Sequence, residues 1–323
     1  MDIKDITISS KARNKVLPNE VWQVLIIGSG PAGLTAGIYA GRAKLKTLLF
    51  TGLPSGGQLM LSAEIDDFPG FPEKMTGPEL IKKITEQVRK FDVEMIERNV
   101  ISVDFKKRPF TIKTDDKEYL AKAVIVATGA SAKWLGLKNE QELIGHGISA
   151  CAVCDGFFFK NKIVGVVGGG DSAMENAIVL TKYAKKVFII HRRNEFKASK
   201  MLQEEVLNNP KIEFIWNSII SEIKGKDSLE GVFVENVKSK EKKFLEIDGL
   251  FISIGYKPAT DIFKGQLELD DYEYIKVKEN TKTSVDGVFA AGDVCDNKYR
   301  QAITAAGLGA MALLDADKWL RNP

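Results

Sequence analysis

Two cysteines three positions apart, Cys151 and Cys154, offer the most distinctive chemistry in this 323-residue chain, and Asp155 follows the second directly. Such a pair could be half of a zinc site, a redox-active disulfide, or two buried thiols without chemistry. The C-x-x-C spacing puts both sulfurs within disulfide reach in a single turn and can lower the pKa of one thiol. An acid at this place could move protons as a disulfide opens, or could be an ordinary first-turn helix acid.

A zinc site is not favoured, because further ligands are scarce. Zinc usually takes four ligands. Beyond the pair the chain offers Cys295, His146 and His191, and it has no second C-x-x-C or H-x-x-H. We therefore predict no metal site, and we expect Cys295 to be an inert thiol. In a reducing compartment a close cysteine pair is more often catalytic or metal-binding than structural.

A nucleotide-binding module begins near the N-terminus. The apolar run Val24–Ile27 leads into G-x-G-x-x-G at residues 28–33. A helix is expected from Pro31 to about Ala43, and a second strand over Leu48–Phe50. The glycines permit a tight turn, a close approach of a pyrophosphate and close packing of helix on strand, while free N–H groups at the helix start bind the diphosphate.

The same plan recurs in the second half of the chain. A strand over Ile163–Val167 enters G-x-G-x-x-A at residues 168–173, and a helix and the strand Val187–Ile190 follow. A further apolar strand follows each copy, within residues 123–130 and 249–256. Two dinucleotide sites in one chain argue for electron transfer between two dinucleotides.

The residues after the second strand of each copy bear on the choice of nucleotide. A NAD site carries an acid there to hold the ribose 2′-OH. The second copy instead has His-Arg-Arg at residues 191–193, with Lys197 close behind. Guanidinium groups suit a phosphate, so this module should take the 2′-phosphate of NADPH, a solvated basic loop being the alternative. The first copy has Thr51 and Gly52 at this place, and general rules do not choose its nucleotide.

The fold class follows from this repetition. The segment 286–296 reads as an apolar strand ending in Gly-Asp, and a Gly- and Ala-rich amphipathic helix follows it. That is more than the second module needs, so we assign both to the first domain. We predict an α/β chain with two Rossmann-like dinucleotide-binding domains, the second inserted into the first. The predicted parts are an N-terminal extension (1–20), a discontinuous first domain (21–130 and 257–323) and a second domain with the cysteine pair (131–256).

Composition excludes several classes of protein. The net charge of +3 is small for this length and does not indicate a nucleic-acid surface. No apolar run approaches the roughly 20 residues needed to span a bilayer. The first residues lack the apolar core of a secretory signal. We expect a cytoplasmic protein that binds neither nucleic acid nor membranes.

Eight motifs together resemble those of low-molecular-weight, bacterial-type thioredoxin reductases, class II pyridine nucleotide-disulfide oxidoreductases. In chain order, from about Gln23 to the C-terminus, they read "GSGPAG", "GGQL", "ATGAS", "CAVCDG", "GGGDSA", "HRRNEFKA", "AAGDV" and "YRQAITAAG". The resemblance implies FAD in the first domain, NADPH in the second, and a homodimer. It further implies that NADPH reduces FAD by hydride transfer, that reduced FAD opens a Cys151–Cys154 disulfide, and that the dithiol reduces oxidised thioredoxin.

The resemblance also implies which residues bind the cofactors. Contacts to FAD would come from the first glycine motif and the loop after the second strand: Gly28, Ser29, Gly30, Pro31, Ala32, Gly33, Thr51, Gly52, Gly56, Gly57 and Gln58. The flavin end would be held by Asp293, Arg300, Gln301 and Ala302. NADPH would lie along the second motif and the basic segment: Gly168, Gly170, Asp171, Ser172, His191, Arg192, Arg193 and Lys197.

By the same resemblance, Cys154 faces the flavin, Cys151 attacks thioredoxin and Asp155 is the acid–base partner. Thioredoxin would dock near Phe157, Phe158 and His146, so we expect the two phenylalanines to be partly exposed. Nicotinamide and disulfide cannot both touch the flavin at once, and the family rotates one domain against the other between the two half-reactions. The connections near residues 131–137 and 255–260 are the expected hinges.

The chain departs from the family pattern at several positions. Asp67 stands where an Asn is common, Lys197 replaces a frequent Arg, and His146 takes a position that is often basic. Residues 1–20 have no counterpart that aligns. The alternatives are another FAD-dependent dithiol–disulfide enzyme on the same scaffold and a non-catalytic redox sensor that binds both nucleotides.

Overall fold

The first glycine motif lies where strand β1 (Val21–Ile27) passes into helix α1 (Pro31–Arg42) in the computed structural model, which describes residues 20–322. Strand β2 (Thr47–Phe50) follows and pairs with β1 in parallel. All four residues of β2 are buried, as expected inside a parallel sheet. The predicted helix and second strand are confirmed to within one residue.

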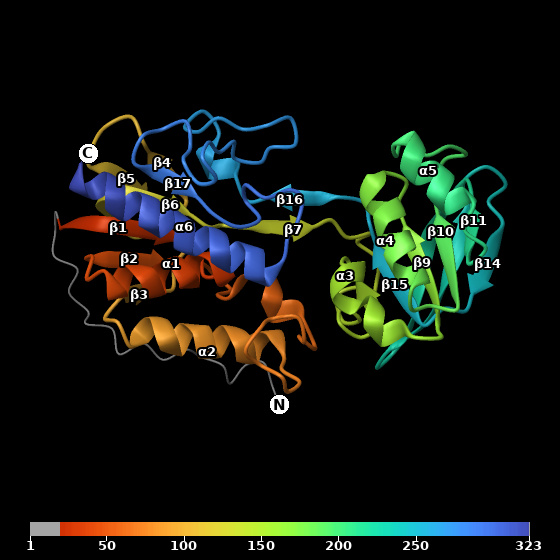
Figure 1. Ribbon diagram of the computed structural model, residues 1–323. Coiled ribbons are helices and arrows are strands. Elements are labelled where there is room, and N and C mark those ends of the chain that lie inside the picture. The colour runs from red at the N-terminus through yellow and green to blue at the C-terminus, as the bar shows by residue number, and fades with distance from the viewer. Residues whose placement is uncertain (1–19, 323) are drawn as a thin grey trace.

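Seven strands form the sheet of the first lobe (Figure 1). Their order is β3–β2–β1–β6–β5–β4, and β17 pairs in parallel with β6. The chain after the second lobe therefore returns to the first sheet. The bounds not yet given are β3 (Glu94–Ile96), β4 (Ser102–Asp104), β5 (Phe110–Lys113), β6 (Glu118–Val126) and β17 (Val288–Ala290).

Three helices accompany this sheet: α1, α2 (Gly77–Arg89) and α6 (Ala302–Arg321). The helix α2 begins with a capping box, in which the Thr76 hydroxyl accepts from Glu79 N and the Glu79 carboxylate accepts from Thr76 N. Helices α1 and α6 cross closely because of Gly309. A Cβ there would lie 2.0 Å from the carbonyl oxygen of Ala32, so a larger residue would push the helices apart.

The second lobe repeats the plan with a five-stranded parallel sheet in the order β11–β10–β9–β15–β8. Its elements are β8 (Ile148–Ser149), α3 (Ala152–Asp155), β9 (Ile163–Val167), α4 (Asp171–Thr181), β10 (Lys186–Ile190), α5 (Lys200–Leu207), β11 (Ile212–Ile215) and β15 (Gly249–Ile252). A three-stranded antiparallel sheet covers it: β12 (Ser218–Gly225), β13 (Leu229–Asn236) and β14 (Lys242–Leu245). The 3₁₀ turns are η2 (Gly57–Leu61), η3 (Gly156–Phe159) and η4 (Asp261–Phe263).

A two-stranded antiparallel ribbon joins the lobes (Figure 1). It consists of β7 (Ala130–Ala132) and β16 (Tyr256–Pro258). The domain boundaries predicted from the sequence fall within this ribbon, and they stay predictions. The predicted fold class, with one Rossmann-like domain inserted into the other, is confirmed.

One buried carboxylate fixes the chain just after the ribbon. Glu140 is 0% exposed and accepts hydrogen bonds from the backbone N–H groups of Leu135, Gly136 and Leu137, at 2.8, 2.6 and 3.3 Å. A buried carboxylate is stable only when its oxygens are satisfied, and three amide donors achieve that here. The segment 135–137 is thereby held to the second lobe.

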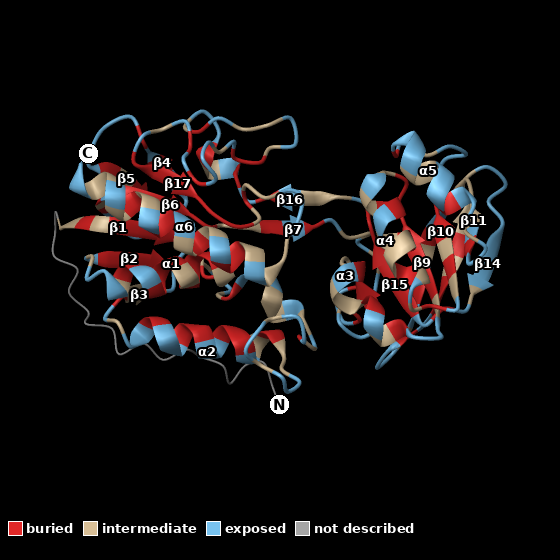
Figure 2. Ribbon diagram, viewed as in Figure 1, coloured by how far each residue is buried: buried red, intermediate tan, exposed pale blue. Residues whose placement is uncertain are grey.

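The cores lie on both faces of each sheet, so the buried strands run through the middle of each lobe (Figure 2). Phe50, Phe110 and Phe251 are among the largest fully buried side chains. Each such side chain contributes roughly 1.5–3 kcal/mol through burial. Within residues 20–322, no helix has the length and apolar character required to cross a bilayer.

Candidate active site

A cavity of about 830 Å³ lies where the two lobes face each other. The ends of β1, β2 and β6 and the starts of α1 and α6 line it from the first lobe. Both cysteines and Asp155 line it from the second lobe. The carboxyl edge of a parallel sheet is where α/β proteins bind their ligands.

The glycines of the first motif shape one end of the cavity. Gly28 has φ +117°, and a Cβ there would lie 2.2 Å from the carbonyl oxygen of Ala127. Gly33 sits against the carbonyl of Gly28, where a Cβ would lie 1.9 Å from the oxygen. Gly30 faces open space and caps α1 without a side-chain hydrogen bond. The first N–H groups of α1 are therefore available to a diphosphate.

The loop after β2 forms the wall beside this cradle. The hydroxyl of Ser29 donates to the carbonyl of Thr51 (2.7 Å) and accepts from Gly56 N (2.8 Å). Gln58 Nε2 donates to the hydroxyl of Ser131 in the connecting ribbon (3.4 Å). Of the residues predicted to hold FAD, Gly33 packs behind the cradle and Gly56 borders a small adjacent cavity. The rest line the large cavity: Gly28, Ser29, Gly30, Pro31, Ala32, Thr51, Gly52, Gly57, Gln58, Asp293, Arg300, Gln301 and Ala302.

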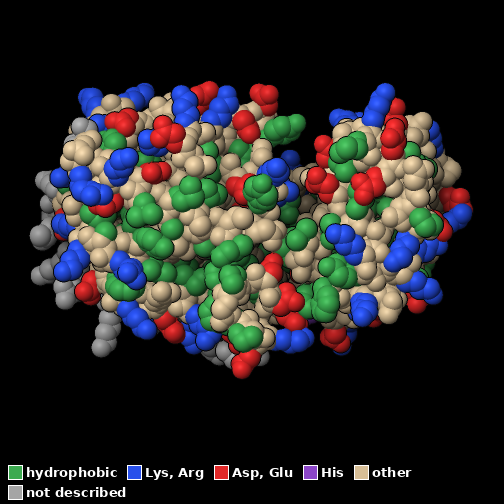
Figure 3. All heavy atoms as spheres, viewed as in Figure 1, with side chains coloured by type: hydrophobic (Ala, Val, Ile, Leu, Met, Phe, Trp, Pro, Cys, Tyr) green, Lys and Arg blue, Asp and Glu red, His purple; other side chains and the backbone are tan. Residues whose placement is uncertain are grey.

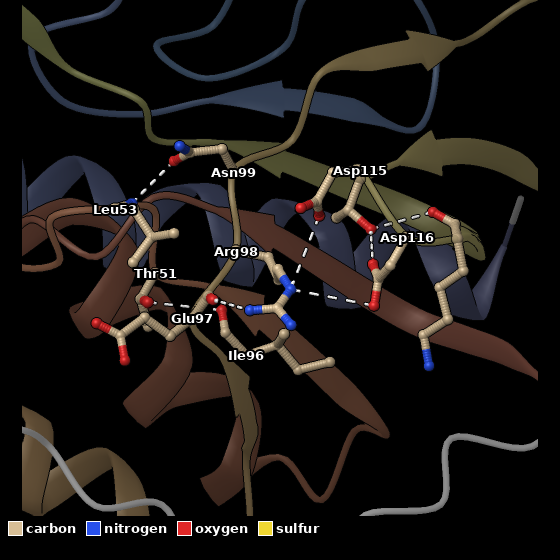
Figure 4. Close-up of polar contacts among 10 residues, drawn as sticks. Thr51, Leu53, Ile96, Glu97, Arg98, Asn99, Asp115 and Asp116 are labelled. Atoms are coloured by element: carbon tan, nitrogen blue, oxygen red, sulfur yellow. Dashed lines mark hydrogen bonds and ion pairs between the residues drawn. The ribbon is translucent and has the colours of Figure 1, made fainter.

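Two cavity residues that sequence reasoning missed, Arg98 and Asn99, follow β3 and lie beside Thr51 (Figure 4). Asn99 Oδ1 accepts from Leu53 N (2.8 Å). Arg98 Nε lies 3.7 Å from Asp115 Oδ1. They reach the cavity because β3 pairs with β2. This pairing joins segments that are far apart in the sequence, and no local motif predicts it.

The predicted flavin end gathers around the start of α6. Burial raises the pKa of Asp293 to about 6, Asp296 adds to this rise, and Arg300 opposes it. The guanidinium carbon of Arg300 stands 4.2 Å from the ring centre of Tyr256, a cation–π contact to the ribbon. Tyr256 in turn donates to the carbonyl of Ala150 (3.1 Å), next to the cysteine pair. Tyr256 also lines the cavity and was not foreseen.

The cysteine pair forms a disulfide with 5.4 Å between the Cα atoms. Cys151 is the N-cap of α3, and its sulfur accepts from Cys154 N at 3.1 Å. The side-chain amide of Gln301, from the other lobe, lies against both sulfurs: Oε1 is 3.8 Å from Cys154 Sγ and Nε2 is 4.0 Å from Cys151 Sγ. The disulfide therefore faces the FAD-type cradle across the domain boundary.

Asp155 borders the same cavity and is half-buried. Burial raises the pKa of its carboxyl, a hydrogen bond from the Ser149 hydroxyl opposes this, and the charges of Asp67 and Asp66 raise it further. A carboxyl with a raised pKa can hold a proton nearer to neutral pH and pass it to a sulfur. Asp67 and Asp66 belong to the first lobe, so their influence depends on how the lobes are placed.

The second glycine motif forms a separate site. Its predicted contacts surround the start of α4 and the end of β10: Gly168, Gly170, Asp171, Ser172, His191, Arg192, Arg193 and Lys197. None of them lines the cavity at the disulfide. Arg192, Arg193 and Lys197 are exposed, and within the described residues none of the three makes an ion pair. The carboxylate of Asp171 accepts from Ser199 N (2.6 Å), which ties the basic loop to α4.

An orphaned nitrogen supports a ligand at this second site. His191 Nε2 is buried and lacks a hydrogen-bond partner within residues 20–322. Its ring packs where a Cβ of Gly169 would be, at 2.2 Å. Burial lowers the pKa of His191, so the ring is neutral near pH 7. Gly170 caps α4 without a side-chain hydrogen bond, so N–H groups are available here as in the first cradle.

Phe157 and Phe158 are both partly exposed, as expected. Phe157 is 58% exposed, Phe158 is half-buried, and Phe159 lies in the core. Val153, between the cysteines, is 64% exposed. His146 is exposed beside the mouth of the cavity.

Cys295 is a free cysteine that packs against its own loop. The Cys295 sulfur contacts the carbonyl of Gly292 (3.3 Å), and burial raises its pKa to about 12, so it is not a nucleophile at ordinary pH. Within residues 20–322, no cluster of three or more His, Cys, Asp or Glu side chains could hold a metal ion.

Comparison with known proteins agrees with this geometry. The family model described as pyridine nucleotide-disulphide oxidoreductase matches residues 22–309. The thioredoxin reductase of Rickettsia felis is 50% identical over 305 residues, which cover 93% of this chain and 98% of the relative. That of Mycolicibacterium smegmatis is 48% identical over 301 residues, covering 93% and 97%.

Two solved structures of similar sequence identity match this chain with different TM-scores. The thioredoxin reductase of Streptococcus pyogenes matches with a TM-score of 0.90 at 40% identity, covering 95% of this chain and 100% of that one. The Lactococcus lactis enzyme, in a structure described as the FR conformation, gives a TM-score of only 0.63 at 38% identity, covering 94% and 100%. The two matches therefore differ in TM-score at similar identity and coverage. The chain belongs to the pyridine nucleotide-disulphide oxidoreductase family and, within it, is a relative of the low-molecular-weight, bacterial-type thioredoxin reductases.

Proposed function

We propose that this chain is an NADPH-dependent thioredoxin-disulfide reductase in which Cys151 and Cys154 are the redox-active pair. The observation that carries the proposal is that the disulfide and the FAD-type cradle line one cavity, while a second, basic nucleotide site lies elsewhere. Bound FAD and NADPH supply two-electron transfer from a hydride donor to a disulfide. The two capping glycines, the orphaned His191 nitrogen and the basic loop fit these two cofactors.

The two sulfurs have different surroundings, which supports different roles. Cys151 Sγ has two N–H groups near it, from Cys154 and Gln301, so it can carry the thiolate charge when the disulfide opens. Cys154 Sγ faces the carbonyl oxygen of Gln301 and has no such donor within residues 20–322. We assign Cys154 as the sulfur that accepts electrons and Cys151 as the thiolate that attacks thioredoxin.

Asp155 is assigned as the acid–base group. Its raised pKa lets it give a proton to a thiolate and take one from a thiol near neutral pH. Because α3 and its N-cap carry both cysteines and Asp155, the three groups move as a unit.

Rotation of the lobes is part of the proposal. The disulfide lines the cavity beside the FAD-type cradle here, so a nicotinamide can take that place only when the second lobe turns away. The different TM-scores of the two thioredoxin reductase structures, 0.90 and 0.63, support a second arrangement of the lobes in the family. Because Glu140 clamps residues 135–137 to the second lobe, we place the hinge in the ribbon itself, near residues 130–134 and 255–259.

Docking of thioredoxin is assigned to the surface beside the disulfide. The exposed side chains of Phe157 and Val153 flank the pair, and His146 lies near it. Exposed apolar groups next to a reactive site are typical of a protein-docking surface.

A homodimer is assigned through α6. Hydrophobic side chains gather over the region of this helix in Figure 3. Three exposed apolar residues, Ile303, Met311 and Leu314, fall on one face of α6 by helical spacing. Gly307 lies on the same face with open space around it, although glycine costs a helix about 1 kcal/mol relative to alanine. A second copy packing closely on α6 would explain both features. Leu314→Asp should then convert a dimer into a monomer in sedimentation, and Lys82→Asp, at an exposed lysine of α2, should leave it unchanged.

The cytoplasm is the proposed compartment, because a reducing compartment that supplies NADPH suits a chain with three cysteines and a catalytic disulfide. The deciding experiment is NADPH oxidation with and without the organism's own thioredoxin. Cys151→Ser should abolish thioredoxin reduction and leave flavin bleaching by NADPH intact, whereas Cys295→Ser should change neither. An enzyme that reduces small disulfides but not thioredoxin would contradict the assignment.

A further inference from the structure

A buried serine connects the two parts of the dithiol site. Ser149 ends β8, the edge strand of the second sheet, and is 6% exposed. Its hydroxyl oxygen accepts from Cys151 N at 3.0 Å, and the hydroxyl donates to Asp155 Oδ2. The carbonyl oxygen of Cys151, at 3.4 Å, is a longer alternative acceptor for the same hydrogen.

The hydroxyl hydrogen decides which oxygen of Asp155 holds the proton. A serine has one hydrogen to give, and the shorter contact assigns it to Oδ2 of Asp155. The carboxylate oxygen that accepts this hydrogen bond is the poorer site for the proton that Asp155 binds. Within residues 20–322, Oδ1 has no hydrogen-bond partner, so a proton on Asp155 resides on Oδ1, on a side chain that borders the cavity.

We propose that Ser149 is a positioning residue, which fixes the carboxyl of Asp155 so that Oδ1 exchanges protons with the cysteine pair. The proposal rests on the proposed function. Ser149, Cys151 and Asp155 all belong to the second lobe, so the network travels with the pair when the lobes rotate.

The exchange between the dithiol and the acceptor disulfide requires a group that carries protons, and this is the role of Oδ1 of Asp155. Cys151 thiolate attacks one sulfur of the acceptor disulfide, that S–S bond breaks, and its electron pair leaves on the other acceptor sulfur. Cys154 then attacks Cys151, the Cys151–Cys154 bond re-forms, and the second acceptor thiolate departs. Cys151 loses its proton to solvent when its thiolate forms and Cys154 gives up the other, so two protons leave the dithiol and two arrive on the acceptor sulfurs. Asp155 accepts the proton of Cys154 on Oδ1 and donates it to the departing acceptor thiolate.

Few other groups influence Asp155. Asp67 and Asp66 face it from the first lobe, and Tyr256 lies close enough for its ionisation to be affected by Asp155. On α4, which packs against α3, the contact is the neutral Asn176, whose Oδ1 accepts from Ala152 N (3.3 Å). Ser149 is the neighbour whose hydrogen bond stabilises the carboxylate.

The test compares Ser149→Thr with Ser149→Val, two side chains of the same shape that differ in the hydroxyl. The holoenzyme is reduced with dithiothreitol, freed of it, and mixed with oxidised thioredoxin in single-turnover experiments across pH. This readout does not require NADPH. We expect the Val variant to exchange about tenfold more slowly than the Thr variant, because a mispositioned general acid–base loses part of its effect. Loss of the hydrogen bond should also move the pH midpoint upward, since a bond to the carboxylate lowers its pKa.

A double-variant cycle separates positioning from simple support of the fold. In an Asp155→Asn background the Thr and Val variants should exchange at equal rates, because the group on which Ser149 acts is gone. Equal rates of the two variants with Asp155 intact, or the same tenfold difference without it, would overturn the proposal. A wild-type enzyme that fails to reduce thioredoxin would instead overturn the proposed function.

Discussion

The amide of Gln301 reaches across the domain boundary to Cys154, with its Oε1 3.8 Å from the sulfur. Its orientation is fixed, because Nε2 donates to the carbonyl of Tyr299 at 3.1 Å. The remaining N–H of Nε2 is on the side of Cys151 Sγ, 4.0 Å away. The first lobe thus presents a donor to one sulfur and an acceptor to the other.

We expect Gln301→Glu to slow the opening of the disulfide, because it replaces the donor near Cys151 with a carboxylate that repels thiolate charge. Gln301→Met, which has neither donor nor charge, should be intermediate. A neutral hydrogen bond is worth about 1 kcal/mol, so Met should cost roughly fivefold in rate. The measurement is the rate at which dithiol appears after anaerobic mixing with NADPH. A Glu variant as fast as wild type would contradict the assigned polarity.

Asp67 provides a test of the electrostatics around Asp155. Asp67→Asn removes a negative charge that raises the pKa of Asp155, so that pKa should fall. If turnover requires protonated Asp155, the alkaline limb of the pH–rate profile should move to lower pH. Asp67 is exposed, and solvent screens its charge, so the shift should shrink further in high salt. The matched control is Asp66→Asn, whose smaller influence predicts a smaller shift in the same direction.

Arg192 tests the identity of the second nucleotide. Arg192→Ala should raise KM for NADPH about 10- to 100-fold, because a hydrogen bond to a charged group is worth about 1.5–3 kcal/mol. The KM for NADH should change little, since NADH lacks the 2′-phosphate. Lys200→Ala, an exposed lysine at the start of α5, controls for a general loss of positive charge. Equal effects on both nucleotides would refute the assignment of Arg192 to the 2′-phosphate.

Glu140 allows a prediction about stability. Glu140→Ala leaves the N–H groups of residues 135–137 without their acceptor, which should lower the free energy of unfolding by about 2 kcal/mol or more. For a chain of this size that corresponds to a fall of a few degrees in Tm. Glu142→Ala, an exposed carboxylate two residues further on, should have almost no effect. Thermal melting of both variants decides the matter, and equal Tm values would show that the clamp contributes nothing.

Local patterns in the sequence predicted what is locally determined. Each glycine motif sits between one strand and one helix, so its spacing alone locates β1, α1, β9 and α4. The exposure of Phe157 and Phe158 was expected from the resemblance alone, because exposure depends on which distant segments pack against a side chain. The return of β17 to the first sheet was inferred from a surplus of elements rather than from pairing preferences.

The residues that were missed are positioned by tertiary contacts. Arg98 and Asn99 reach the cavity because β3 lies beside β2, and Tyr256 does so because the ribbon passes over the disulfide. In the sequence, nothing distinguishes Ser149 from any other serine at the end of a short strand. Its role becomes visible only in the fold, where its hydroxyl donates to Asp155. The relative placement of the lobes has no local signal either, since it depends on contacts between segments far apart in the chain, such as that of Gln301 with the cysteine pair.

The placement of the lobes can be tested by locking it. A Cβ at Gly145 would lie 3.2 Å from the Cβ of Ala63, across the boundary and near the spacing that a disulfide requires. We expect the oxidised Ala63→Cys/Gly145→Cys variant to lose at least about tenfold in flavin reduction by NADPH, because the Cys151–Cys154 segment then stays at the cavity. Gly145→Cys alone controls for the strain of a side chain at φ +79°, and Ala63→Cys alone controls for an added thiol. Flavin bleaching at the wild-type rate in the cross-linked protein would show that no rotation is needed. Recovery after mild reduction of the cross-link would attribute the loss to the lock, since reduction releases the lobes without changing any residue.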